Sequence, residues 1–301
     1  MPTLSRLHRP LLVFTAAMAL LAVIAAVGVA VDSRVLTGMP IWAKPLKFSV
    51  SFVLYAGTLA WMLSLLPRRG RAAGWAATVI VATGVAEMVV IVGQVLRGTT
   101  SHYNEQTPFD ALLWQVMAVS IMVLFGAHFV VGVALLRARI ADRAAAHAVR
   151  WGLGLSLLGM LAAIPMTLPS AAPAGQTGIA GAHSVGVSDG GPGLPLLGWS
   201  TTGGDLRIGH FVGLHALQAL PLLAMLLGRR ADTLTRLRLI AVGGGAYGAL
   251  TVLLTWQALR GQPLLQPDAL TLAAVGALII ATALAAGAVL RARRPELELA
   301  A

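Results

Sequence analysis

The sequence predicts an all-α, polytopic membrane protein built as a bundle of eight transmembrane helices. Of its 301 residues, 57% are hydrophobic and only 11% are charged, whereas about a quarter of the residues in a soluble domain are charged. Several apolar runs approach the ~20 residues that a helix needs to cross the hydrocarbon core. These runs are continuous, whereas the strands of a membrane β-barrel would alternate in short segments, which excludes a barrel.

The rest of the composition excludes several function classes. The chain has no cysteine, which rules out disulfides, thiolate catalysis and cysteine-held iron–sulfur clusters. The net charge of +11 would be compatible with nucleic-acid binding. However, the basic residues gather at the ends of the apolar runs, which is typical of membrane topology and indicates no nucleic-acid partner.

The first half of the chain, residues 1–150, contains four expected spans, at about residues 11–31, 48–66, 74–96 and 110–136. The first apolar run is longer than the ~7–15 residues of a signal-peptide core, so we expect an uncleaved anchor. Lys44 and Lys47 precede the second span, where we expect them to reach the lipid headgroups by snorkelling.

The second half, residues 151–301, contains the other four spans, at about residues 151–168, 210–227, 237–259 and 269–290. A basic loop, 137–150, leads into it. A long Gly-rich loop, 169–209, separates the fifth span from the sixth, and loops of this length are usually functional or disordered. Trp199, Asp205 and Arg207 favour order late in this loop, whereas 170–178 resembles a flexible connector.

The distribution of basic residues predicts the orientation. If the N-terminus is cytoplasmic, 16 of the 22 Lys and Arg residues fall in inner segments. The outer ones are Arg34, Lys44, Lys47, Arg97, Arg207 and Arg260. This asymmetry predicts a multi-pass protein of the cytoplasmic membrane with both termini inside and the Gly-rich loop outside.

Two sequence matches indicate an internal repeat. GQVLRG (93–98), followed by Asp110, matches WQALRG (256–261), followed by Asp268, and LLPRR (65–69) matches LLGRR (226–230) upstream. The offset is four spans, so both halves have the same orientation. The sequence therefore predicts a parallel 4+4 duplication, with a site where the halves meet.

Titratable residues collect on the outer side. They include His102, Tyr103, Glu105, His183, Asp189, Asp205, Arg207, His210 and His215. His102, His183, His210, His215 and Asp205 are the candidate metal ligands, with a metal ion or haem as the candidate cofactor. His210 and His215 are five residues apart, on different helix faces, so each needs partners from elsewhere. Alternatively, His210 caps its helix and His215 forms a hydrogen bond across helices.

Glu87 is the acidic residue expected deep inside a span, where an ionised carboxylate costs at least a few kcal/mol. Gln94 and Arg97 follow on nearly the same helix face, and the repeat places Gln257 and Arg260 in the matching positions. We expect a polar, outward-open cleft between spans three and seven, with Glu87 catalytic and these four residues binding a ligand. The alternative is that these polar groups satisfy one another between helices.

Other residues have structural interpretations. His128 lies too deep to share the outer site, so we expect a hydrogen-bonded core histidine. Gly244 and Gly248 form a GxxxG pattern, which predicts close helix packing.

The segments PIWAKPLKF, GQVLRGTTSHYNEQTPFD and GGPGLPLLGWSTTGGDLRIGHFVGLHALQALP resemble those of an uncharacterised family of bacterial multi-pass membrane proteins, common in actinobacteria. The resemblance covers most of the chain and implies the inner membrane of a bacterium, but it implies no activity or cofactor. Haem A synthase is similar in its eight spans and outer histidines, but the present chain lacks histidines in spans two and eight.

Three functions remain open. The leading hypothesis is a metal- or haem-dependent membrane enzyme or redox protein, with His210 and His215 as ligands or bases and Glu87 as proton acceptor. The second is an ion- or proton-coupled transporter that uses Glu87. The third is a non-catalytic accessory or sensor subunit. The expected partners are the lipid bilayer and a small-molecule or lipid ligand.

Overall fold

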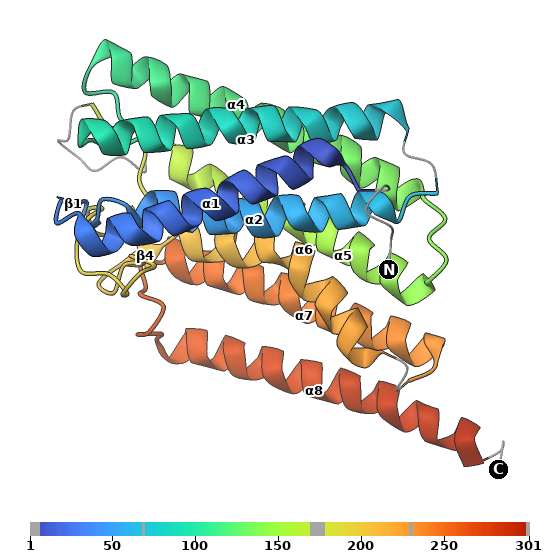
Figure 1. Cartoon of the computed structure of the whole chain (residues 1–301). Coiled ribbons are helices and arrows are strands. Elements are labelled where there is room, and N and C mark those ends of the chain that lie inside the picture. The colour runs from blue at the N-terminus through green and yellow to red at the C-terminus, as the bar shows by residue number, and fades with distance from the viewer. Residues whose placement is uncertain (1–6, 68–69, 169–177, 229–230, 299–301) are drawn as a thin grey trace.

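A computed structural model describes residues 7–67, 70–168, 178–228 and 231–298. Within these residues, eight helices are long and apolar enough to cross a membrane, as predicted. They run side by side in an elongated bundle, with both described ends of the chain at the same end of it (Figure 1). The helices are α1 (Arg9–Val31), α2 (Ala43–Ser64), α3 (Arg71–Arg97), α4 (Pro108–Arg137), α5 (Arg143–Leu161), α6 (Arg207–Leu227), α7 (Thr233–Leu259) and α8 (Ala269–Glu298).

Short strands and a 3₁₀ turn lie in the connections between these helices. β1 (Val35–Leu36) pairs with β2 (Met39–Pro40), β3 (Ser184–Val185) pairs with β4 (Gly204–Asp205), and the turn η2 (Ile164–Thr167) follows α5. We call the end of the bundle formed by residues 32–42, 98–107, 178–206 and 260–268 the long-loop end. The opposite end, where α5 and α7 begin, is the short-loop end.

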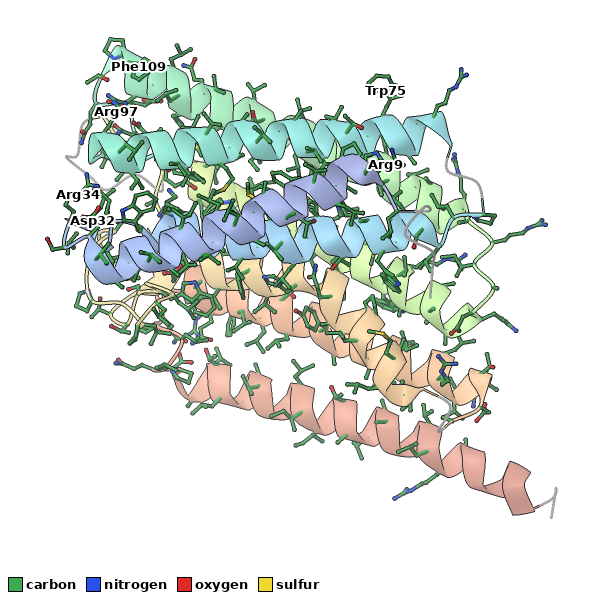
Figure 2. All side chains as sticks on the ribbon, viewed as in Figure 1. Arg9, Asp32, Arg34, Trp75, Arg97 and Phe109 are labelled. Carbon is green, nitrogen blue, oxygen red and sulfur yellow. The ribbon has the colours of Figure 1, made fainter. Side chains whose placement is uncertain are left out.

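Charged side chains mark both ends of the bundle. Figure 2 shows Asp32, Arg34 and Arg97 at the long-loop end, and Arg9 towards the short-loop end. Phe109 lies against the Arg97 guanidinium, 4.8 Å from its carbon to the ring centre. Charged groups at helix ends and apolar side chains between them suit a bundle that crosses a bilayer.

The apolar interior falls into two main clusters. One lies among helices α1, α2, α3 and α4, where Leu59, Ile80 and Val131 are fully buried. It also includes Leu153 of α5 and Leu217 of α6. The other lies among α5, α6 and α7. α5 and α6 therefore contribute to both clusters and join the two parts of the bundle.

Glycines bring helices into close contact. A side chain at Gly159 of α5 would overlap with the backbone of Gly213 and Leu214 of α6. Gly244 of α7 lies against the Trp151 ring, where an added Cβ would meet ring carbon at 2.5 Å. The packing predicted for the GxxxG pattern of α7 is therefore confirmed.

α8 is set apart from the other helices. Its apolar stretch has no buried residue in the bundle, it packs on α7, and it diverges from the bundle towards the C-terminus (Figure 1). Exposed side chains such as Ile279, Ile280 and Leu284 suit a lipid environment.

Several expected boundaries were wrong. α2 begins at Ala43, five residues before the expected start, because the first turn of a helix tolerates Pro45, which has no N–H to donate. α5 begins inside the expected basic loop, since Asp142 caps it by accepting hydrogen bonds from the Ala144 and Ala145 amides. It ends at Leu161, and Pro165 lies in η2. The expected connector 170–178 falls almost wholly outside the described residues.

Candidate functional site

The described part of the Gly-rich loop is ordered around Asp205. This carboxylate is completely buried and accepts hydrogen bonds from the Ser200 amide and the Arg207 guanidinium. Arg207 also donates to the Gly198 carbonyl at 2.6 Å. The order predicted from Asp205 and Arg207 is therefore confirmed, and it gives Asp205 a structural task.

His183 is held at the base of this loop by Asp189. Its Nδ1 lies 2.6 Å from the Asp189 carboxylate, which also accepts hydrogen bonds from the His183 and Ser184 amides. Burial lowers the pKa of His183, although Asp189 opposes this effect. Burial alone would raise the pKa of Asp189, but the His183 hydrogen bonds leave it lowered. The pair is therefore a neutral imidazole that donates from Nδ1 to an ionised carboxylate.

His102 contacts a lysine. Its Nδ1 lies 2.9 Å from the Lys44 ammonium, and the rings of Phe48, Tyr103 and Trp114 surround it. The expectation that Lys44 snorkels to lipid was wrong, because α2 begins early enough to aim this side chain into the bundle. Lys47 is likewise engaged, donating to the Leu197 carbonyl at 2.8 Å.

Three histidines are brought together at the long-loop end. The pKa of His102 lies well below its usual value because of burial first, and then because of the Lys44 ammonium and of His183 and His210 whenever these are protonated. His210 is fixed by a hydrogen bond between its Nδ1 and the Gly159 carbonyl, 2.8 Å away. The interpretation of His210 as a helix cap was wrong, since the ring bonds to the neighbouring helix α5.

These three rings share one arrangement. Each is hydrogen-bonded through Nδ1, and within the described residues no hydrogen bond reaches any of their Nε2 atoms. Tyr103 packs edge-on against His183, with ring centres 5.1 Å apart, and burial raises the pKa of its phenol. We call His102, His183 and His210, together with Lys44, the imidazole cluster.

The predicted metal ligands do not form one chelating set. In the described part of the chain, no three His, Asp or Glu side chains are grouped so as to hold a metal ion. His215 interacts with Gln218 and Phe211 on its own helix. Gln218 then donates to Thr58 of α2, so the polar link across helices runs through Gln218.

Glu87 lies in the interior of the bundle. Its side chain is 1% exposed, and both carboxylate oxygens are without a hydrogen-bond partner among the described residues. The charge of Lys44, at the start of α2, acts on it. Glu87 is therefore connected electrostatically to the imidazole cluster.

The polar groups expected to line a cleft have other partners. Gln94 and Arg97 both donate to Asp110 of α4, which was predicted only as part of the repeat. Gln257 donates to the Pro263 carbonyl, and Arg260 pairs with Asp268. The prediction of a cleft between spans three and seven was wrong. α3 packs mainly on α4, α2 and α1, whereas α7 packs mainly on α6, α5 and α8.

His128 is a core histidine, as predicted. It is completely buried and links α2, α4 and α5 through Tyr55 at 2.9 Å and Ser156 at 3.0 Å. Because Ser156 donates its hydroxyl hydrogen to the Leu153 carbonyl, it accepts from His128 Nε2, and Nδ1 accepts from Tyr55. Every polar atom of this network has a partner, so it leaves no group free for chemistry.

Lys44 was not predicted as a residue of the site. The prolines of PIWAKPLKF are compatible with the first turn of a helix, which would place Lys44 in the helix. However, the position of the lysine in the sequence fits contact with lipid headgroups equally well. Searches against family models, curated proteins and solved structures find no match to this chain.

Proposed function

We propose that this protein is a proton-coupled membrane protein in which Glu87 exchanges a proton with the long-loop end through the imidazole cluster. The single observation that carries the proposal is the carboxyl group of Glu87, buried in an expected membrane span, with neither oxygen hydrogen-bonded to any residue that the structure describes. Such groups are costly in a bilayer and mark ion pathways and proton relays.

The groups between Glu87 and the surface support this function. His183 and Asp189 are 23% and 29% exposed, so water reaches them. His183 acts on His102, His102 contacts Lys44, and the charge of Lys44 acts on Glu87. The titratable groups therefore connect the loop to the interior through electrostatic interactions.

The orientation and the repeat belong to the same proposal. We place the long-loop end outside, on the evidence of the basic residues at the short-loop end. The parallel roles of Arg97–Asp110 and Arg260–Asp268, each joining the end of one helix to the start of the next, support the 4+4 duplication. Proton flow would then run inward from the extracytoplasmic side, coupled to a small-molecule or lipid ligand.

The test is proton movement by the full chain in proteoliposomes that contain a pH-sensitive dye. We expect an imposed pH gradient to drive proton flux that Glu87→Gln abolishes, whereas Glu105→Gln, a change in an exposed outer carboxylate, leaves flux unchanged. Infrared spectra add a readout that needs no substrate: the C=O band of a protonated buried carboxyl should disappear in Glu87→Gln. Full flux together with an unchanged C=O band in Glu87→Gln would contradict the proposal.

A second candidate, a membrane enzyme or redox protein with histidine ligands, is favoured by one observation. His183 and His210 are both anchored through Nδ1 to oxygen atoms, a carboxylate and a carbonyl, and no described residue forms a hydrogen bond with their Nε2 atoms. Metal-ligating histidines are oriented in this way. Elemental analysis and an absorption spectrum of purified protein test this candidate. A stoichiometric metal or a haem band should be present and should be lost in His183→Ala and His210→Ala but kept in His147→Ala.

A further inference from the structure

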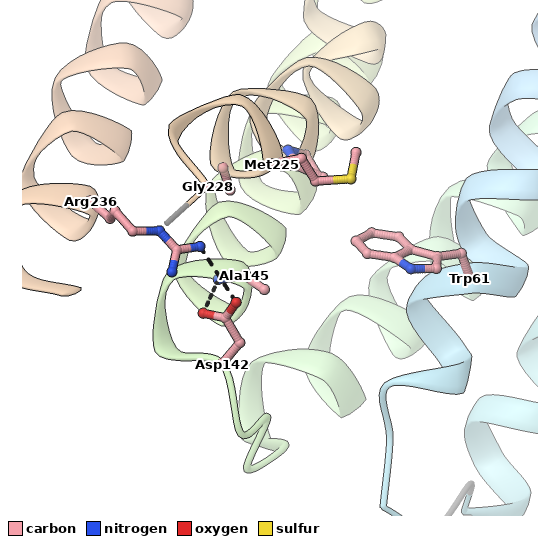
Figure 3. A pocket seen from close by; sticks show the side chains of 8 residues that line it. Trp61, Asp142, Ala145, Met225, Gly228 and Arg236 are labelled. Carbon is pink, nitrogen blue, oxygen red and sulfur yellow. Dashed lines mark hydrogen bonds and ion pairs between the residues drawn. The ribbon is translucent and has the colours of Figure 1, made fainter. Parts of the chain in front are cut away.

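A second site lies at the short-loop end, far along the bundle from the imidazole cluster. A pocket of about 290 Å³ opens there between four helices. Figure 3 shows Trp61 of α2 across from Arg236 and Asp142, with Met225 and Gly228 between them. The lining residues are Trp61, Asp142, Ala145, Pro221, Ala224, Met225, Gly228 and Arg236.

The local sequence explains why space is left here. Pro221 lies inside α6, where it lacks an N–H and so interrupts the hydrogen-bond ladder of the helix. Small residues, Ala145, Ala224 and Gly228, form much of the wall. Their side chains are too short to fill the gap that remains between α2 and α6.

The polar side of the pocket has an unsatisfied hydrogen-bond donor. The Nε of Arg236 is buried and has no hydrogen-bond partner within the described residues. Its Nη2 lies 3.5 Å from an oxygen of Asp142, a long separation for a hydrogen-bonded ion pair. The other oxygen of Asp142 is engaged in capping α5. The side chain of Arg236 is only 17% exposed, and leaving a buried guanidinium donor unpaired is costly. An oxyanion in the pocket would satisfy it.

The other walls are apolar and face the membrane. Met225 is 61% exposed, and Trp61 is half-buried near the end of α2. A tryptophan at this depth is typical of the boundary between headgroups and acyl chains. The pocket therefore combines an anion-binding donor with a surface suited to hydrocarbon.

We propose that this pocket binds the phosphate headgroup of an anionic phospholipid, with Arg236 on the phosphate and with Trp61 and Met225 against the glycerol and the first acyl carbons. Basic pockets between membrane helices on the cytoplasmic side bind such headgroups. Arg139 and Arg143, exposed basic residues in and after the α4–α5 connection at this end, add to the attraction. The site is separate from Glu87 and does not depend on the proposed function.

The test is lipid retention by the full chain, measured by native mass spectrometry in detergent with added phosphatidylglycerol or phosphatidylcholine. We expect phosphatidylglycerol to bind in preference, and Arg236→Gln to weaken it about tenfold, the equivalent of one charge-assisted hydrogen bond. Arg238→Gln, an exposed arginine on the same helix, is the matched control and should bind as the unchanged protein does. Ala145→Leu narrows the pocket, keeps Arg236 and should also reduce binding.

A second measurement locates the lipid. Phosphatidylglycerol brominated in its acyl chains should quench tryptophan fluorescence, and the quenching should fall in Trp61→Phe. Equal retention of the two lipids, or equal loss in Arg236→Gln and Arg238→Gln, would overturn the proposal. Displacement of the lipid by millimolar inorganic phosphate, with the same dependence on Arg236, would show that the ligand is a free phosphate and would overturn the lipid assignment.

Discussion

The protonation of single residues at the long-loop end depends on burial and on a few contacts. His102 is the clearest case, since burial, Lys44, His183 and His210 all lower its pKa. A group whose pKa is lowered in the folded protein is protonated more readily in the unfolded chain, so acid favours unfolding. The contribution is complete above the unfolded value of about 6.5 and is lost as the pH falls towards the folded value.

We therefore predict that the melting temperature in detergent falls between about pH 8 and about pH 5, and that His102→Gln makes this dependence shallower. Other groups that face His102 include Ser101 and Tyr103, and neither changes charge in this range. The measurement is scanning fluorimetry at a series of pH values. An unchanged slope in His102→Gln would show that another group dominates.

Asp205 allows a prediction about stability. It is fully buried against Arg207, and removal of one member of a buried pair leaves the other uncompensated. We expect Asp205→Asn to lower the free energy of unfolding by about 3 kcal/mol. Asp268→Asn is the matched change in an exposed pair and should cost much less, because solvent screens this pair and asparagine still caps α8. Unfolding by detergent titration measures both, and equal losses would contradict the assignment.

At the scale of elements, the contact between α5 and α6 positions the imidazole cluster. Gly159 provides both the close approach to Gly213 and the carbonyl that holds His210. We predict that Gly159→Ala separates the helices, releases His210 and destabilises the protein by about 1–3 kcal/mol, the usual range for overpacking. Unfolding titration and the pH dependence of the His210 imidazole signal in NMR measure these effects.

Gly154, on the same helix, is the control for this change. Its added Cβ would meet no atom within 4 Å, and alanine favours a helix over glycine by about 1 kcal/mol. Gly154→Ala should therefore be neutral or stabilising. If Gly154→Ala and Gly159→Ala behave alike, backbone propensity explains the result and the close approach does not.

The elements show how far the sequence alone predicts this fold. Continuous apolar runs predicted the eight helices because the bilayer requires about 20 such residues for each span. The start of α2 was missed because the lysines were placed in the connection before the span, whereas the first turn of the helix includes Lys44 and accepts Pro45. The contacts Lys44–His102 and Lys47–Leu197 join residues 58 and 150 positions apart, and no local pattern encodes such pairs. The burial of Glu87 was predicted. That no described residue forms a hydrogen bond with its carboxylate depends on how neighbouring helices pack, which the local sequence does not encode.

For the whole molecule, the prediction concerns sidedness. The chain has no cysteine, so single cysteines give an unambiguous signal. We expect a membrane-impermeant maleimide to label Ser188→Cys in intact cells, because this exposed residue lies in the Gly-rich loop. Ala141→Cys, exposed at the short-loop end, should react only after the membrane is permeabilised. The reverse pattern would invert the orientation and place the imidazole cluster in the cytoplasm.

The loop from residue 178 onwards contacts the connections of three other helix pairs. Gly190 lies against Thr37, Ile179 pairs with Asn104, and Gly186 lies near Gly261. During synthesis, α1 to α5 leave the ribosome before most of this loop exists, and α7 follows after it. Glu87 and Lys44 must therefore enter the bilayer while the residues that will enclose the His102 region are still missing. The cluster is completed only when α6 arrives with His210, so a chain that is truncated before α6 should lack the histidine that completes it.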